Sequence, residues 1–223
     1  MTEQEWLTAT DPDVLWDFLS DKVSDRKYQL YAVAWCRRIW DLFPTMHARG
    51  VVDALEQLAD GTADQELLEN AKDRLLEDEQ SYDVHSDTNS AQAYAHSAAV
   101  TCWGDKGSAL ASVAPDYCQE ALHVQSGSKS RDLRAELRAQ AEMVREFFPN
   151  PFRPVTLDPR WLSSTVLDLA RTIYEERLYE RMPILADALM DAGCDGEEII
   201  NHCQESGPHV RGCWVVDLIL SKE

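Results

Sequence analysis

The chain has 223 residues, 44% of them hydrophobic, and a formal net charge of −19. This length is enough for one large domain or two small ones with a buried core. The negative charge repels nucleic acid and anionic membranes, so it argues against duplex binding and leaves room for a basic protein partner. The chain contains no run of about 18 apolar residues, and we therefore expect no membrane span.

The first residues and the cysteines indicate in which cellular compartment we expect the protein. The opening sequence has neither the basic region nor the apolar region of a signal peptide. Six cysteines without such a signal indicate free thiols in a reducing environment rather than a disulfide framework. We therefore expect a cytoplasmic protein.

Apolar residues recur at helical spacing in the N-terminal part of the chain. Asp11 followed by Pro12 is typical of a helix start and predicts a short helix over 12–20. The strongest pattern lies in 24–43, where Ser24 provides a cap and one face is apolar: Tyr28, Tyr31, Ala32, Trp35, Ile39 and Leu42. This stretch predicts a long helix that buries its aromatic face.

Further helices are predicted over 48–60 and beyond. Gly61 ends the first of them, and Thr62 with Gln65 has the spacing of a capping box that opens the next. Pro115 predicts a helix break or a helix start, because proline lacks the backbone donor that a helix interior needs.

Half of the charge excess lies in 53–87, which holds twelve Asp and Glu residues against Lys72 and Arg74, a net of −10. Such a run indicates either a solvated helical face or an acidic docking surface.

The clearest boundary is the proline-rich segment 149–159, where four prolines forbid helix and predict an extended chain. We therefore expect an N-terminal helical region over 1–148 and a C-terminal helical block over 149–223, packed together as one unit. The apolar segment 213–220 is predicted as a final helix, because no convincing strand exists to pair with it. The predicted fold is all-α, an array of antiparallel helix pairs.

The C-terminal block gathers the residue types that bind zinc. Zn²⁺ prefers four thiolate or imidazole ligands in a tetrahedron. The candidate ligands are Cys194, His202, Cys203, His209 and Cys213, although adjacent His202 and Cys203 point about 100° apart on a helix. The alternative is structural, because buried cysteines behave as small hydrophobes. Zinc is the cofactor that this cluster permits.

The same residues permit a nucleophile. Cys213 with His209 or His202 as its base, oriented by Asp217 or Glu205, has the residue types of a thiol nucleophile. No feature of the sequence marks an oxyanion hole, so no catalytic residue is assigned.

Two further charged groups have structural and functional interpretations. Asp217 lies in an apolar run and needs a partner such as Arg211 or a helix N-terminus. Arg37 and Arg38 lie beside tryptophans, which fits either a nucleic-acid patch or ion pairs with an acidic neighbouring helix.

Two blocks of the chain, "SDRKYQLYAVAWCRRIWDLF" near the start and "NPFRPVTLDPRWL" through "GPHVRGCWVVDLILSKE" at the end, carry a resemblance. They resemble an uncharacterised bacterial protein family of mainly planctomycete genomes. The resemblance implies no reaction, cofactor or catalytic residue. The chain differs at Trp35, where the family has a cysteine beside Cys36. The C-terminal block also looks like a portable piece appended to other proteins, which suggests an interaction module.

The leading hypothesis for function is a non-enzymatic interaction or adaptor protein with an acidic docking surface. The chain has no Walker loop, no dinucleotide fingerprint, no zinc-protease motif and no nucleophile elbow. Two alternatives remain open. One is a zinc-stabilised or Cys/His-dependent protein, and the other is an acidic nucleic-acid mimic or accessory factor of a defence or DNA-processing system.

Overall fold

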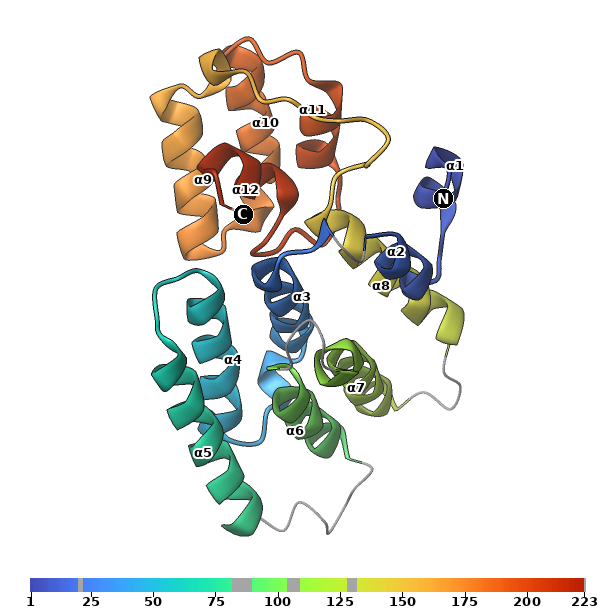
Figure 1. Ribbon diagram of the computed structural model, residues 1–223, viewed down its shortest axis with the longest axis vertical. Coiled ribbons are helices and arrows are strands. Elements are labelled where there is room, and N and C mark those ends of the chain that lie inside the picture. The colour runs from blue at the N-terminus through green and yellow to red at the C-terminus, as the bar shows by residue number, and fades with distance from the viewer. Residues whose placement is uncertain (20–21, 82–89, 104–108, 128–131, 223) are drawn as a thin grey trace. The chain divides into compact units, whose positions relative to one another are not determined.

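The structure is a computed structural model that describes residues 1–19, 22–81, 90–103, 109–127 and 132–222. These residues form helices α1 to α12 and no β-strand (Figure 1), which confirms the predicted all-α fold. Within the same residues, no helix is both long and apolar enough to cross a membrane.

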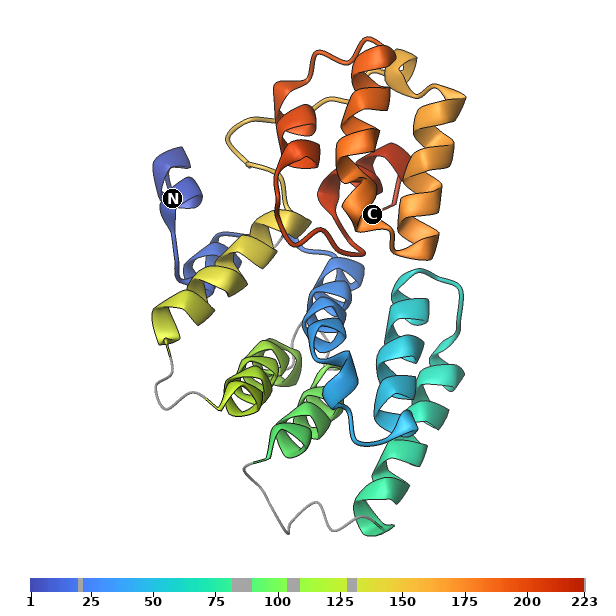
Figure 2. The same cartoon turned by 180° about the vertical axis from the view of Figure 1, so that it is seen from behind.

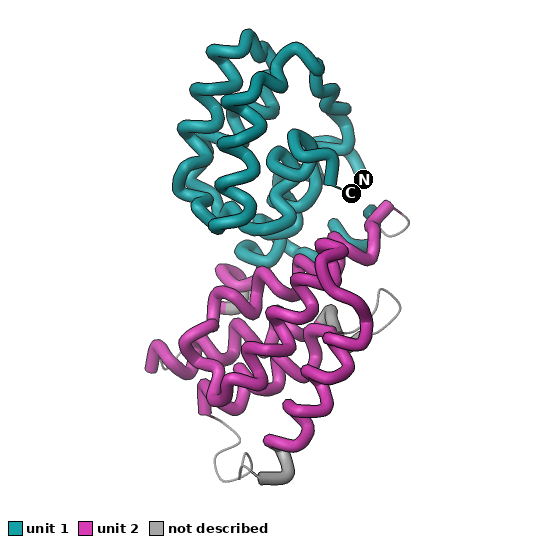
Figure 3. The backbone as a smooth tube through the Cα atoms, turned by 90° about the vertical axis from the view of Figure 1, so that its left-hand side faces the viewer, with its two compact units in different colours: residues 1–21, 137–223 teal, residues 22–136 magenta. Residues whose placement is uncertain are grey.

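The chain divides into two compact units (Figure 3). Unit 1 consists of residues 1–21 and 137–223, and unit 2 consists of residues 22–136. The sequence-based boundary at 148/149 falls inside unit 1. Arg145 explains part of this division, because its guanidinium donates to the backbone carbonyls of Trp6 and Ala9 and so attaches the N-terminal segment to the helix before the prolines.

Unit 2 is a set of packed helices in which α4 lies beside α5, α6 beside α7, and α3 against both α4 and α7 (Figure 2). Their bounds are α3 Asp25–Arg38, α4 Met46–Ala59, α5 Gln65–Ser81, α6 Ala91–Thr101 and α7 Ala109–Ser126. The helix predicted over 24–43 ends earlier, at Arg38, and a short 3-10 turn follows it. Most of the predicted apolar face is buried, while two of its residues are only partly buried: Tyr28 and Leu42. Arg37 pairs with Asp53 at 2.5 Å and with the buried Glu56 at 2.6 Å. These ion pairs favour the structural interpretation of the arginines.

Two local predictions in unit 2 are wrong. The box of Thr62 and Gln65 does not form, because the side chain of Asp64 accepts from the backbone N–H of Leu67 while the Thr62 hydroxyl donates to a carbonyl of α4. Pro115 lies inside α7 instead of at its start. Burial of α7 against α3 and α6 outweighs the roughly 3 kcal/mol that an interior proline costs.

The core of unit 1 lies between the C-terminal helices. There α10 packs against both α9 and α11, and α12 packs against α9. The helices of this unit are α1 Glu3–Thr8, α2 Pro12–Leu19, the part of α8 Leu133–Phe147 from residue 137 onward, α9 Ser164–Glu176, α10 Met182–Asp191, α11 Glu197–Gln204 and α12 Trp214–Leu220. The segment predicted as a final helix is α12, which confirms that prediction. The proline-rich segment forms no α-helix, and its Val155 and Leu157 pack against the core.

Candidate metal centre

Four side chains of unit 1 bring potential metal ligands together. Glu146, His202, His209 and Cys213 each offer one ligand atom, and these atoms all lie within 4.8 Å of one another. Glu146 comes from the end of α8 and His202 from α11, His209 lies in the following loop, and Cys213 caps α12. The side chain of Glu146 is 3% exposed, that of His209 is 6% and that of His202 is 11%.

The backbone of Gly212 packs closely against the ring of Phe147, and this contact holds the loop before α12 against α8. Gly212 has φ +99, and a Cβ built on it would lie 2.3 Å from Cε1 of Phe147, the residue after Glu146. Only glycine combines this conformation with this contact. The loop therefore packs directly on the end of α8, and this contact places His209 and Cys213 beside the Glu146 carboxylate.

Glu146 and His209 form a buried ion pair. His209 Nδ1 lies 3.2 Å from both carboxylate oxygens, and His209 Nε2 lies 3.1 Å from the carbonyl of Glu205. Both ring nitrogens thus face acceptors, which assigns a proton to each of them. Burial would lower the pKa of His209, but the hydrogen bond and charge of Glu146 raise it. Burial would raise the pKa of Glu146, but hydrogen bonds from His202 and His209 lower it to about 2.

The tautomer of His202 is assigned by Trp214. The indole Nε1–H of Trp214 donates to His202 Nδ1 at 3.1 Å, and an indole nitrogen is only ever a donor. His202 Nδ1 must therefore be unprotonated, and the neutral ring carries its proton on Nε2. That Nε2 lies 3.3 Å from Glu146 Oε2 and 3.2 Å from Cys213 Sγ.

These assignments leave Cys213 as a neutral thiol. Its full burial raises the pKa of Cys213 well above 9.0, and the charge of Glu146 raises it further. His202 Nε2 cannot accept the thiol proton while it holds its own. Glu205 contacts His209 through its backbone carbonyl instead of its carboxylate. The geometry of this metal-free arrangement does not favour a Cys–His nucleophile, since the thiolate is the reactive form.

Three of the five ligands predicted from the sequence lie in the cluster: His202, His209 and Cys213. The other two, Cys194 and Cys203, are not in it. Cys203 lies in the apolar core, where burial raises its pKa to about 12. This outcome agrees with the expectation that adjacent His202 and Cys203 diverge on their helix.

The sequence analysis missed Glu146, which contributes the buried carboxylate. A signal was present, because Met143, Val144 and Phe147 form a buried apolar stripe at this end of the helix and Glu146 lies at the edge of that stripe. A carboxylate buried at such an edge requires partners.

Geometry and donor type fit a transition ion of the zinc class. One carboxylate oxygen, two imidazole nitrogens and one thiolate are all zinc ligands, and bonds of about 2.0–2.3 Å imply separations of about 3.3–3.8 Å between tetrahedral ligands. The separations of 3.2 and 3.3 Å at Glu146 and the two histidines are close to this range. The Glu205 carbonyl on His209 Nε2 is the usual outer partner of a metal-bound imidazole.

One contact opposes a metal at His202. A metal on Nε2 requires the proton on Nδ1, where the Trp214 indole now donates. The indole must give up this hydrogen bond before all four groups can bind one ion.

The remaining predicted features lie elsewhere. In the acidic stretch, the exposed carboxylates of α5 follow helical spacing: Glu66, Glu69, Asp73 and Glu77. This arrangement fits a solvated face, while Asp83 and Asp87 fall outside the described residues. Asp217 is 2% exposed in the first turn of α12, and Arg211 donates to the carbonyl of Tyr174.

We compared the chain with protein-family models, with curated proteins and with solved structures, and none of these comparisons returned a match.

Proposed function

We propose that unit 1 is a metal-stabilised helical module in which Glu146, His202, His209 and Cys213 bind one zinc-class ion. The observation that carries the proposal is the convergence of these ligand atoms, all within 4.8 Å of one another. The ion would link the end of α8 to the α11–α12 segment, which lies more than 50 residues further along the chain. Its role is to stabilise the fold, because closed four-ligand sites contribute folding energy directly.

Burial and donor chemistry support a structural role over a catalytic one. The ligand side chains are between fully buried and 11% exposed. All four positions of a tetrahedron are supplied by the protein, so no position is left open for substrate.

The first experiment is native mass spectrometry of protein purified from zinc-supplemented culture without a histidine tag, compared with the denatured mass. The expected result is an excess of one zinc per chain, lost in Cys213→Ser and His209→Ala and retained in the control Cys203→Ala. Cys203 is the matched control because it is a buried cysteine of the same unit outside the cluster.

Cobalt gives an independent readout of the ligands. Co²⁺ bound through Cys213 has a thiolate-to-metal charge-transfer band that Cys213→Ser must abolish. A native mass equal to the bare chain, together with no such band after Co²⁺ addition, would exclude the proposed metal site.

A further inference from the structure

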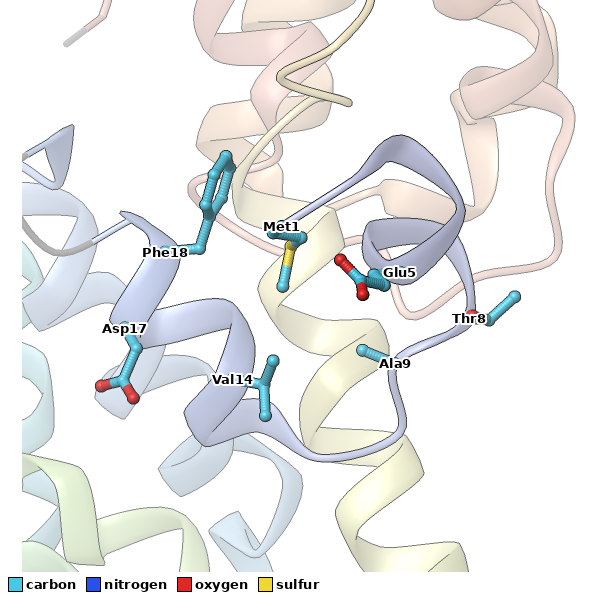
Figure 4. Close-up of a pocket in the computed structure, with 7 residues that line it drawn as sticks. All are labelled: Met1, Glu5, Thr8, Ala9, Val14, Asp17 and Phe18. Carbon is cyan, nitrogen blue, oxygen red and sulfur yellow. The ribbon is translucent and has the colours of Figure 1, made fainter.

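A cleft of about 580 Å³ opens between α1 and α2 of unit 1, and none of its lining residues is a candidate metal ligand (Figure 4). Its apolar lining comes from Met1, Ala9, Val14 and Phe18. Figure 4 shows the side chains of Met1 and Val14 pointing toward the space between the two segments. Val14 is 48% exposed, so this part of the apolar lining is accessible to a partner.

The walls of the cleft are anchored. Arg145 of α8 donates to the carbonyls of Trp6, in α1, and of Ala9, the residue that ends α1, and so attaches this end of α1 to α8. The Trp6 side chain is 1% exposed and packs near Phe18, with ring centroids 6.2 Å apart. Phe18 also stacks on Phe152 at 5.6 Å and 14°. The apolar lining of the cleft therefore lies on α1 and α2, and contacts with Arg145 and Phe152 hold these helices in place.

Two carboxylates flank this apolar surface. Glu5 and Asp17 line the cleft, one from each helix. Glu5 forms a capping box with Thr2, in which its carboxylate accepts from the backbone N–H of Thr2 at 2.7 Å. Hydrogen bonds from Thr2 and the charge of the α-amino group lower the pKa of Glu5. Asp17 has no hydrogen bond or ion pair with any described residue. Among the residues of unit 1 that the structure describes, no side-chain cation forms an ion pair with Glu5 or Asp17.

We propose that this cleft binds a segment of a partner protein in which a large apolar side chain lies between Lys or Arg residues. This open cleft of about 580 Å³ has room for one or two large side chains. The Glu5 and Asp17 carboxylates complement flanking cations, and the net charge of −19 opposes a second copy of this chain as the occupant. This inference does not depend on the metal centre.

The probe is a displayed library of short random peptides selected on the intact protein. The expected consensus is Leu, Met, Phe or Trp flanked by Lys or Arg. The dissociation constant of a selected peptide, measured by fluorescence anisotropy, should weaken roughly tenfold or more in Val14→Glu and in Asp17→Lys, and it should also weaken with added salt. Both positions are exposed, so the fold should be retained, and the melting temperature verifies this.

The control is Asp187→Lys, which reverses an exposed carboxylate on α10 of the same unit outside the cleft and should leave the dissociation constant unchanged. Enrichment of acidic peptides, no enrichment, or binding that Val14→Glu and Asp17→Lys leave intact would overturn the proposal. Self-association of the wild-type protein that Val14→Glu abolishes would also overturn it, in favour of a dimer interface.

Discussion

Nδ1 of His209 lies 3.2 Å from both carboxylate oxygens of Glu146, although the two residues are 63 positions apart in the chain. The contact joins a helix end to a loop that approaches it only because Gly212 permits the contact with Phe147. This ion pair has consequences for stability that do not require the metal to be present.

Removal of the carboxylate should destabilise the metal-free protein. In Glu146→Gln, the buried His209 loses its counter-charge, and breaking a buried pair in this way costs about 3 kcal/mol or more. Urea denaturation of chelator-treated protein measures the loss. Glu142→Gln on the same helix is the control, because Glu142 is exposed and its removal should change the free energy of unfolding little. Equal effects of both variants would contradict the ion pair.

The pH dependence of the metal-free protein should follow the two partners. The pKa of Glu146 is lowered to about 2, so its contribution is fully present above its ordinary value of 4.5 and is lost as pH falls toward 2. The pKa of His209 is raised, so its contribution is fully present below 6.5 and is lost as pH rises through the raised value.

Stability from this pair should therefore be greatest between these ordinary values, 4.5 and 6.5. Urea midpoints across this range and above it test the prediction. The decline of the urea midpoint above pH 6.5 should be smaller in His209→Gln. Zinc affinity should run the other way and increase with pH, because the ligands must lose protons. A urea midpoint that rises with pH above 6.5 in the metal-free wild type would contradict the assignment.

Trp214→Phe should tighten metal binding. The phenyl ring has no donor, so His202 Nδ1 becomes free to carry the proton while Nε2 binds the ion. Loss of one competing hydrogen bond of about 0.5–1.5 kcal/mol predicts an affinity increase of up to about tenfold. Competition against a chelator of known affinity measures it. Trp161→Phe is the control, being a partly buried tryptophan of the same unit. Unchanged or weaker binding in Trp214→Phe would contradict the tautomer assigned to His202.

Gly212→Ala should be severely destabilising. A Cβ there lies 2.3 Å from the Phe147 ring and the residue keeps φ +99, so steric overlap and backbone strain together predict a loss of about 2–4 kcal/mol. The control is Gly207→Ala, where a Cβ meets nothing within 4 Å. Combining Gly212→Ala with Phe147→Leu should cost less than the sum of the single variants, since the smaller side chain relieves the overlap. If the two losses of stability simply added, the Phe147 ring would not be the reason why position 212 requires glycine.

Local sequence rules predicted most of the helices. The start of α2 at Pro12, the Ser24 cap of α3 and the final helix α12 depend on spacing and capping within a few residues, and the structure has all of them. The wrong predictions are those in which a local preference lost to packing or to a neighbouring cap. Pro115 is retained within α7, and Asp64 replaces Thr62 as the cap of α5.

The sequence by itself determined the helical class and three of the four ligands in the cluster, because periodicity and residue type are local properties. It did not determine that Glu146 completes the cluster or that Cys194 and Cys203 stay outside it. Nor did it determine that the Trp214 indole competes for His202. The contacts of Glu146 join α8 to residues more than 50 positions away and depend on the packing of the Phe147 ring over Gly212. The indole contact joins α12 to α11, two short helices that the sequence does not show to be neighbours. The same is true of the α1–α2 cleft, whose walls are held in place by Arg145, a residue of a helix that follows more than 100 positions later.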